Sequence, residues 1–123
     1  MSVRIKRVAW SALLASVPML ANDAAYNRGE TLYFSKGCAS CHGPSAEGSS
    51  TFPRLANQQK SYLVKKLSDF RAGRTSTPPQ EMMAQFAQDL SDRNIDDLAT
   101  FLSEHKKKET PDVNDNLLGG NET

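Results

Sequence analysis

The clearest alternation of hydrophobic and polar positions lies near the end of the chain, over residues 91–105. Its apolar side chains recur at i, i+3, i+4 and i+7, as on one face of a helix; they are Ile95, Leu98, Ala99 and Leu102. Ser91 is suited to cap this helix, because its hydroxyl can accept from a free N–H of the first turn. Acidic residues near the start and lysines at positions 106–108 suit the helix dipole. We therefore predict an amphipathic helix that begins after Ser91.

Two earlier stretches show the same helical spacing. In residues 25–37 the positions at this spacing are Tyr26, Gly29, Leu32 and Tyr33, with Gly37 as a natural stop. In residues 57–73 the apolar face consists of Leu63, Leu67 and Phe70, and Gly73 closes the segment. Both stretches are predicted to be short helices.

The segments between these helices are long and rich in turn-forming residues. Residues 37–57 are predicted to be a loop, and a loop of this length in a compact domain usually serves a function. Pro78 and Pro79 predict a break, because consecutive prolines do not fit inside a helix. A short helical piece over residues 83–87 is expected to follow.

The predicted fold class is all-α, with three to four short helices joined by long loops. No stretch shows the period-two alternation of a strand. The length of 123 residues suits one domain. The apolar side chains are too few for a large core, so the chain is expected to pack around something else.

The first residues differ from the rest of the chain. Three basic residues precede an apolar run over residues 8–20, which is shorter than the roughly 20 residues of a membrane-spanning helix. This order is typical of a secretory signal peptide. We assign it to residues 1–21, and positions up to residue 25 are also candidates for the cut. An uncleaved N-terminal anchor is the alternative. We assign residues 22–108 to the domain and residues 109–123 to a polar disordered tail.

Charge is nearly balanced, with 15 basic and 14 acidic residues. A nucleic-acid-binding protein would show a basic stripe or a strong basic excess, so no nucleic-acid partner is expected. A signal peptide would carry both cysteines to an oxidising compartment outside the cytoplasm.

The candidate chemistry lies in the motif Cys-Ala-Ser-Cys-His, which is formed by Cys38, Cys41 and His42. Cys-x-x-Cys-His is the attachment signature of c-type haem. One helical turn can present both sulfurs to the two vinyl groups on one edge of a porphyrin. The next residue, His42, then lies beneath the ring, where its Nε2 can bind the iron.

Three other interpretations of the two cysteines stay open at this point. They can form a structural disulfide, which suits an exported protein. They can act as a thioredoxin-like redox pair, but that needs a βαβ pattern, which the sequence lacks. A zinc site needs a fourth strong ligand, and we expect the only other histidine, His105, to be a solvated surface residue.

A haem iron also needs a sixth ligand or an open position. His105 would make the site bis-histidine, whereas a methionine would raise the reduction potential. Outside the predicted signal, the methionines are Met82 and Met83, on the loop before the last helix. Either methionine is also explained as core packing.

The sequence resembles the class I c-type cytochromes, and most closely the small bacterial periplasmic monohaem members and one half of the dihaem members. The resemblance covers roughly residues 26–104, through the stretches "GETLYFSKGCASCHG", "FPRLANQQKSYLVKKLSDFRAG" and "MMAQFAQDLSDRNIDDLATFL". It implies a small cytochrome c fold that wraps around one covalently bound haem c.

The resemblance also implies the roles of individual residues. Cys38 and Cys41 would attach the haem, and His42 would be the proximal iron ligand. The carbonyl of Pro53 would accept a hydrogen bond from the Nδ1–H of that histidine, and Leu55 would pack on the haem. Met83 would be the distal ligand, with Met82 as the alternative. Gly29 and Tyr33 match positions where the first helix crosses the last, here at Leu98 and Phe101.

The implied function is that of a soluble periplasmic carrier of single electrons, with no catalysis of its own. Its partners would be a donor complex or dehydrogenase and a terminal oxidase or reductase, which it binds transiently. One alternative is the electron-accepting subunit of a periplasmic dehydrogenase. Another is a five-coordinate haem that acts as a peroxidase or gas sensor, which would require the absence of a methionine ligand.

Overall fold

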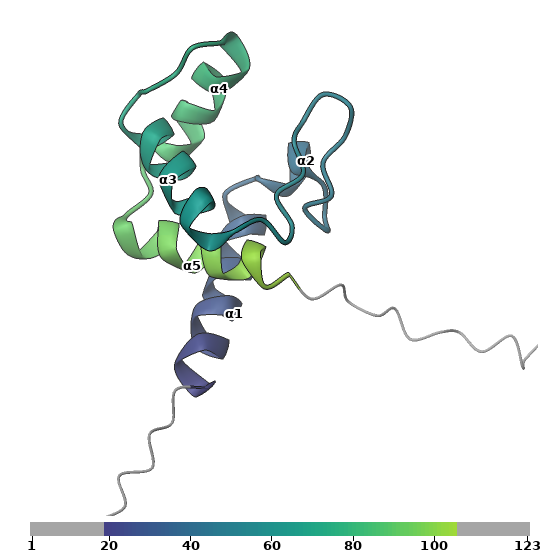
Figure 1. The fold of residues 1–123 in the computed structure, drawn as a ribbon, viewed down its shortest axis with the longest axis vertical. Helices are drawn as coiled ribbons and strands as arrows, with labels where there is room; N and C mark the ends of the chain where they lie inside the picture. Colours follow the sequence, from purple (N-terminus) through teal and green to yellow (C-terminus); the bar gives the residue numbers. More distant parts are fainter. Residues whose placement is uncertain (1–18, 106–123) are drawn as a thin grey trace, which may run out of the picture.

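The computed structural model describes residues 19–105, which form five helices and no strand (Figure 1). They are α1 (Met19–Ser35), α2 (Ala39–His42), α3 (Lys60–Arg71), α4 (Pro78–Ala87) and α5 (Asp92–Ser103). The prediction of an all-α fold is confirmed. The sequence predicted three or four helices, and the additional one is the single turn α2 inside the expected loop. Most of the predicted signal peptide and the whole of the predicted tail lie outside the described residues.

Helix α5 matches its sequence prediction closely. Ser91 caps the helix, since its hydroxyl accepts from the backbone N–H of Asn94 at 3.0 Å. The side chain of Asn94 in turn accepts from the backbone N–H of Ser91 at 3.1 Å, which completes a capping box. All four residues of the predicted apolar face are buried: Ile95, Leu98, Ala99 and Leu102.

Helices α1 and α5 cross at close range, with α3 and α4 on one side of the crossing and α2 and its loop on the other (Figure 1). A Cβ atom added to Gly29 would overlap the carbonyl group of Asp97 and lie 2.7 Å from Cβ of Phe101. Only glycine therefore permits this approach. Tyr33 packs on Phe101 with ring centroids 5.4 Å apart. The crossing predicted at Gly29, Tyr33 and Phe101 is thus present.

Helix α4 begins earlier than the sequence predicted. Pro78 and Pro79 occupy its first turn rather than a break before it. Proline fits there because the first N–H groups of a helix have no partner within the helix, and its fixed φ is already helical. As a result Met82 and Met83 lie within α4, and not on a loop as expected.

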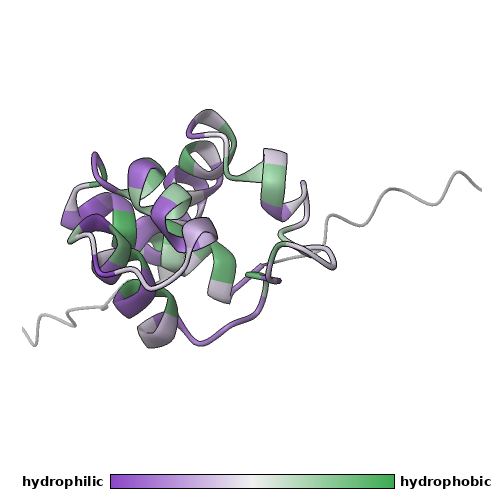
Figure 2. Cartoon of the chain, turned by 90° about the horizontal axis from the view of Figure 1, so that it is seen from above, coloured by the Kyte–Doolittle hydropathy of each residue, from purple (hydrophilic) through white to green (hydrophobic). Residues whose placement is uncertain are grey.

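The colouring of the ribbon shows that hydrophobic and hydrophilic residues are mixed along the helices (Figure 2). The buried part of the core is nevertheless concentrated on α5, with Tyr33 from α1. Helix α3 contributes only Leu63 to it and α4 only Ala87. Three large apolar side chains of α3 and α4 are about half exposed: Tyr62, Met82 and Phe86.

Candidate haem site

Cys38 directly precedes the single helical turn α2, and Cys41 lies within it. The backbone N–H groups of Cys41 and His42 both donate to the carbonyl of Cys38, at 3.3 and 3.0 Å. Ahead of the turn, the N–H of Cys38 donates to the carbonyl of Tyr33 at 3.1 Å, which ties α2 to the end of α1. Both cysteines are half-buried and neither forms a disulfide. The expected single turn that presents two thiols is present.

Burial raises the pKa of the Cys38 thiol. A thiol with a raised pKa stays protonated at neutral pH, whereas the attacking cysteine of a redox-active Cys-x-x-Cys pair has a lowered pKa. Among residues 19–105 there is also no strand that would support the thioredoxin-like interpretation. The environment of Cys38 therefore disfavours that interpretation.

His42 is buried, with 5% of its surface exposed. Its Nδ1 lies 2.9 Å from the carbonyl oxygen of Pro53. A carbonyl can only accept, so Nδ1 carries the proton, and Nε2 is left with its lone pair available to a metal. The hydrogen bond that the resemblance implied between His42 and Pro53 is thus present, and it fixes both the tautomer and the ring orientation. The edge of Phe52 also packs on the imidazole, with centroids 6.1 Å apart.

The loop that carries Pro53 is fastened back onto the motif. The N–H of Gly48 donates to the carbonyl of His42 at 2.8 Å. Gly48 has φ +71, and a Cβ there would lie 2.6 Å from the carbonyl oxygen of Phe52 and 2.7 Å from the carbonyl carbon of Pro53. The residue thus needs both the left-handed conformation and the absence of a side chain.

Ala46 joins the two arms of this loop. It is fully buried with φ +51, and its carbonyl accepts from the N–H groups of Leu55 and Ala56, both at 3.0 Å. Leu55 is half-buried and packs against the core. The long loop is therefore a fixed support for Pro53 rather than an irregular connection.

Helices α1 and α5 each hold this loop with one hydrogen bond. The hydroxyl of Tyr33 donates to the carbonyl of Gly43 at 2.6 Å, and burial raises the pKa of Tyr33, which keeps the hydroxyl protonated. The N–H of Asn57 donates to the carbonyl of Leu102 at 2.7 Å. The crossing of α1 and α5 thus positions the histidine through the loop.

The two methionines of α4 differ in exposure. Met82 is 50% exposed, whereas Met83 is half-buried. Helix α4 approaches the motif from the side of Phe86, whose ring edge would lie 4.0 Å from a Cβ added to Gly37. The methionine that the resemblance favours is therefore the one turned further from solvent.

His105 is not the solvated residue that the sequence predicted. Both of its ring nitrogens are buried and have no hydrogen-bond partner. The ring meets Phe101 edge-on at 5.3 Å, which draws it inward at the end of α5. Within residues 19–105, no three His, Cys, Asp or Glu side chains converge to hold a metal ion, so the motif is not a preformed zinc cage.

Two thiols on one turn, followed by a buried histidine whose free nitrogen is Nε2, fit the donor set of a covalently attached haem. This geometry defines a c-type haem-binding protein. The sequence model of the family "Cytochrome c" matches residues 26–106, and the chain belongs to the cytochrome c family.

Individual relatives agree with this assignment. Cytochrome c-554(547) of Halothiobacillus neapolitanus is 36% identical over 91 residues, which cover 68% of this chain and 97% of that protein. Cytochrome c4 of Azotobacter vinelandii is 32% identical over 85 residues, which cover 67% of this chain and 40% of that protein. This chain spans only 34% of the length of cytochrome c-552 from Acidithiobacillus ferridurans.

Solved structures of two cytochromes c4 share the fold. The protein from Acidithiobacillus ferrooxidans superposes with a TM-score of 0.57 at 30% identity, covering 65% of this chain and 49% of that one. The reduced recombinant protein from Pseudomonas stutzeri superposes with a TM-score of 0.58 at 30% identity, and the match covers 66% of this chain and 48% of that one. The prediction of a class I c-type cytochrome is confirmed, and it makes the cofactor a covalently bound haem c with its iron.

The comparisons also make the chain a c-type electron-transfer cytochrome. Within the part of the chain that the structure describes, none of the helices has the length and apolar character to cross a membrane.

Proposed function

We propose that this protein is a periplasmic monohaem cytochrome that carries single electrons between redox proteins. Cys38 and Cys41 form the two thioether bonds, His42 is the proximal iron ligand through Nε2, and Met83 is the distal ligand. The observation that carries the proposal is the 2.9 Å hydrogen bond between Nδ1 of His42 and the carbonyl of Pro53. It gives the histidine the tautomer that a metal ligand needs, and it makes the nitrogen more basic.

The haem, once bound, supplies a one-electron couple between ferrous and ferric iron. The residues of this chain would limit the access of substrate and water to that iron. If His42 and Met83 both bound the iron, it would have no open position for a substrate, which would suit outer-sphere electron transfer. Leu55 and the partly buried Leu67 and Phe70 of α3 would help to keep water from the haem, which would tune its potential.

Met83 is proposed over Met82 because it is the less exposed of the two. The Met83→Ala variant should lose the thioether ligand, lower the reduction potential and let the iron take up carbon monoxide. Met82→Ala is the matched control and should leave the weak ferric absorption near 695 nm, an expectation for methionine ligation, unchanged. If only Met82→Ala abolishes that band, Met82 is the ligand.

Export to the periplasm is supported by the order of basic, apolar and small residues at the N-terminus. We assign residues 1–21 to a signal peptide, with positions up to residue 25 as further candidates for the cut. Mass spectrometry of the protein purified from the periplasm would give the mature N-terminus. An intact Met1 on membrane-bound protein would contradict this assignment and support an anchor.

A second function is favoured by one relative. The thiosulfate dehydrogenase electron acceptor of Stutzerimonas stutzeri is 36% identical over 74 residues, although these cover only 34% of that protein. On this alternative, the chain accepts electrons from a dehydrogenase to which it is stably bound. Co-purification with a larger catalytic subunit at one-to-one stoichiometry would support it over a freely diffusing carrier.

An optical redox titration of the purified protein tests the main proposal. We expect a red protein whose spectrum follows a single one-electron transition. The oxidised form should show the 695 nm band, and the reduced form should not bind carbon monoxide. A colourless protein would exclude the carrier function altogether, and ready carbon monoxide binding would favour the peroxidase or sensor alternative.

A further inference from the structure

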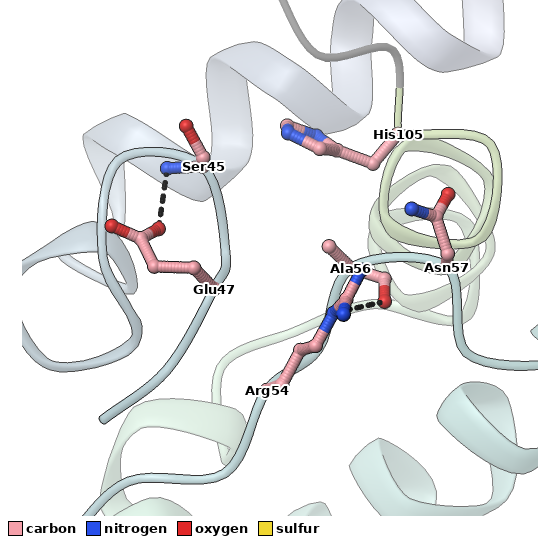
Figure 3. A pocket seen from close by; sticks show the side chains of 6 residues that line it. All are labelled: Ser45, Glu47, Arg54, Ala56, Asn57 and His105. Atoms are coloured by element: carbon pink, nitrogen blue, oxygen red, sulfur yellow. Dashed lines mark hydrogen bonds between the residues drawn. The ribbon is translucent and has the colours of Figure 1, made fainter. Parts of the chain in front are cut away.

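A pocket of about 280 Å³ lies between the loop and the end of α5 (Figure 3). It is separate from the proposed iron ligands and is not used by the proposed function. Its lining comes from both arms of the loop and from the second residue after α5: Ser45, Glu47, Arg54, Ala56, Asn57 and His105.

His105 has unmet hydrogen-bonding capacity at this pocket. Its Nδ1 and Nε2 are both buried without a partner, and its ring extends from the end of α5 toward Ser45 (Figure 3). Burying a polar atom without a partner is destabilising. Such groups in a native protein are usually met by water or an ion.

Arg54 brings a positive charge to the same pocket. Its Nε donates to the carbonyl of Ala56 at 3.2 Å, and among residues 19–105 no carboxylate lies within ion-pair distance of it. The guanidinium lies beside Ala56 in Figure 3, and the amide of Asn57 lies on the other side of Ala56. The terminal N–H groups of the guanidinium suit the planar geometry of an oxyanion.

Glu47 is the only acidic residue of the lining. Its carboxylate accepts from the backbone N–H of Ser45 at 2.8 Å and points toward Ser45, away from Arg54 (Figure 3). The two opposite charges line one pocket but do not form an ion pair. Three other lining side chains can donate hydrogen bonds to a ligand: Arg54, Asn57 and His105.

We propose that this pocket binds a small inorganic oxyanion, such as sulfate or phosphate. The guanidinium of Arg54 supplies the charge and two parallel donors. Asn57 donates through its amide and His105 through a ring N–H, which satisfies a buried nitrogen that is otherwise without a partner. The ligand is held by side chains of this chain alone, so the proposal does not depend on the identity of the iron ligands.

The proposal is tested by NMR on the purified, reduced full-length protein. Sodium sulfate is titrated at constant ionic strength, with sodium chloride as the balancing salt, and the ring protons of His105 and the amide of Asn57 are followed. We expect saturable shifts at both residues. Shifts that rise linearly, or none at all, would mean that water fills the pocket, and they would overturn the proposal.

Substitutions of three exposed residues test the expected direction of the change in sulfate affinity. Arg54→Gln should weaken sulfate binding about tenfold or more, because it removes a charge-assisted pair. Glu47→Gln should strengthen binding, because it removes the one negative charge of the lining. Arg93→Gln removes a positive charge from α5 outside the pocket and should change affinity less than about twofold. Equal effects of Arg54→Gln and Arg93→Gln would reduce the finding to general charge attraction and overturn the proposal.

A haem carboxylate is a competing occupant with the same chemistry. If it fills the pocket, the haem-containing protein will not take up sulfate, and the shifts at His105 will be absent. That outcome would also overturn the proposal. The proposed function would be unaffected, since the optical titration is read independently.

Discussion

The crossing of α1 and α5 differs sharply from the pair formed by α3 and α4. At the crossing, large side chains are buried to completion, and Phe101 keeps only 1% of its surface exposed. In the α3–α4 pair, Phe86 is 49% exposed, and Leu67 and Phe70 are only half-buried. Both regions have apolar faces, but only the first finds enough protein to cover its face.

This difference assigns different roles to the two regions. The crossing is a protein core that holds the histidine loop through Tyr33 and Asn57. The α3–α4 pair has apolar surface in excess of what the chain can cover. A flat, largely apolar macrocycle is the kind of partner that would cover it. We therefore expect the crossing to depend less on the cofactor for its stability than the α3–α4 pair does.

Removing the thioether bonds should have the largest effect. In the double variant Cys38→Ala/Cys41→Ala, haem cannot be attached covalently, and α3 and α4 lose what they pack around. Hydrogen exchange should then show fast-exchanging amides throughout α3 and α4 and slower ones in α5. Ser40→Ala, in the same turn but exposed, is the control and should keep both haem and protection. Equal protection of α3 and α5 in the double variant would remove the distinction between the regions.

Truncating one aromatic ring in each region compares them in the haem-bound protein. Phe101→Ala should lower the free energy of unfolding by about 3–5 kcal/mol, because it leaves a cavity beneath Tyr26, Tyr33 and His105. Phe86→Ala should cost less, about 1–2 kcal/mol, because the protein itself covers only half of that ring and only the haem would cover more of it. Urea unfolding followed by circular dichroism measures both. Equal costs would show that the haem covers Phe86 as completely as the protein core covers Phe101.

The sequence predicted the first region better than the second, and the reason is physical. Helix α5 is specified locally, by the cap at Ser91 and by apolar residues at helical spacing. The predicted start of α4 was wrong. Pro78 and Pro79 predict a break in a helix unless they occupy its first turn, as they do here. That position depends on what precedes the helix, which the spacing of apolar residues does not reveal.

The site shows the same division. The motif at Cys38, Cys41 and His42 could be predicted from the sequence because the attachment chemistry itself fixes the spacing of its residues. The left-handed conformation of Ala46 and its complete burial leave no local signal, since alanine rarely adopts positive φ. His105 looked like a surface residue because its lysine neighbours in sequence are polar. Its burial depends on Phe101 and on the distant loop.

A methyl group added where the helices cross should test how close their approach is. Gly29→Ala should lower the free energy of unfolding by about 2 kcal/mol, because α1 and α5 must separate and the gain in helix propensity is smaller. Gly73→Asn, at φ +73 with open space around it, is the control. Asparagine tolerates this conformation, so we expect a cost below about 0.5 kcal/mol. A harmless Gly29→Ala would mean that the crossing is loosely packed.

The smallest effect is expected at Asp69, on the surface of α3. Hydrogen bonds from Lys65 at 2.6 Å and from Arg74 at 2.6 and 2.9 Å lower the pKa of its carboxyl. Because the folded pKa lies below the unfolded one, about 3.9, the stabilisation is present above that pH and is lost as pH falls through the folded pKa. It is small, since Lys65 and Arg74 remain largely in solvent.

The Asp69→Asn variant should therefore be slightly less stable than the parent at pH 7 and equal to it at strongly acid pH, with a difference that 1 M salt reduces. Asp97→Asn gives the contrast at the crossing. Its carboxylate is buried and takes two hydrogen bonds of 2.8 Å from Arg28, so salt should screen its loss much less. Urea unfolding at two salt concentrations separates the two cases. If salt screens both losses equally, the Asp97 carboxylate is accessible to water in solution, and the crossing is no drier than the surface of α3.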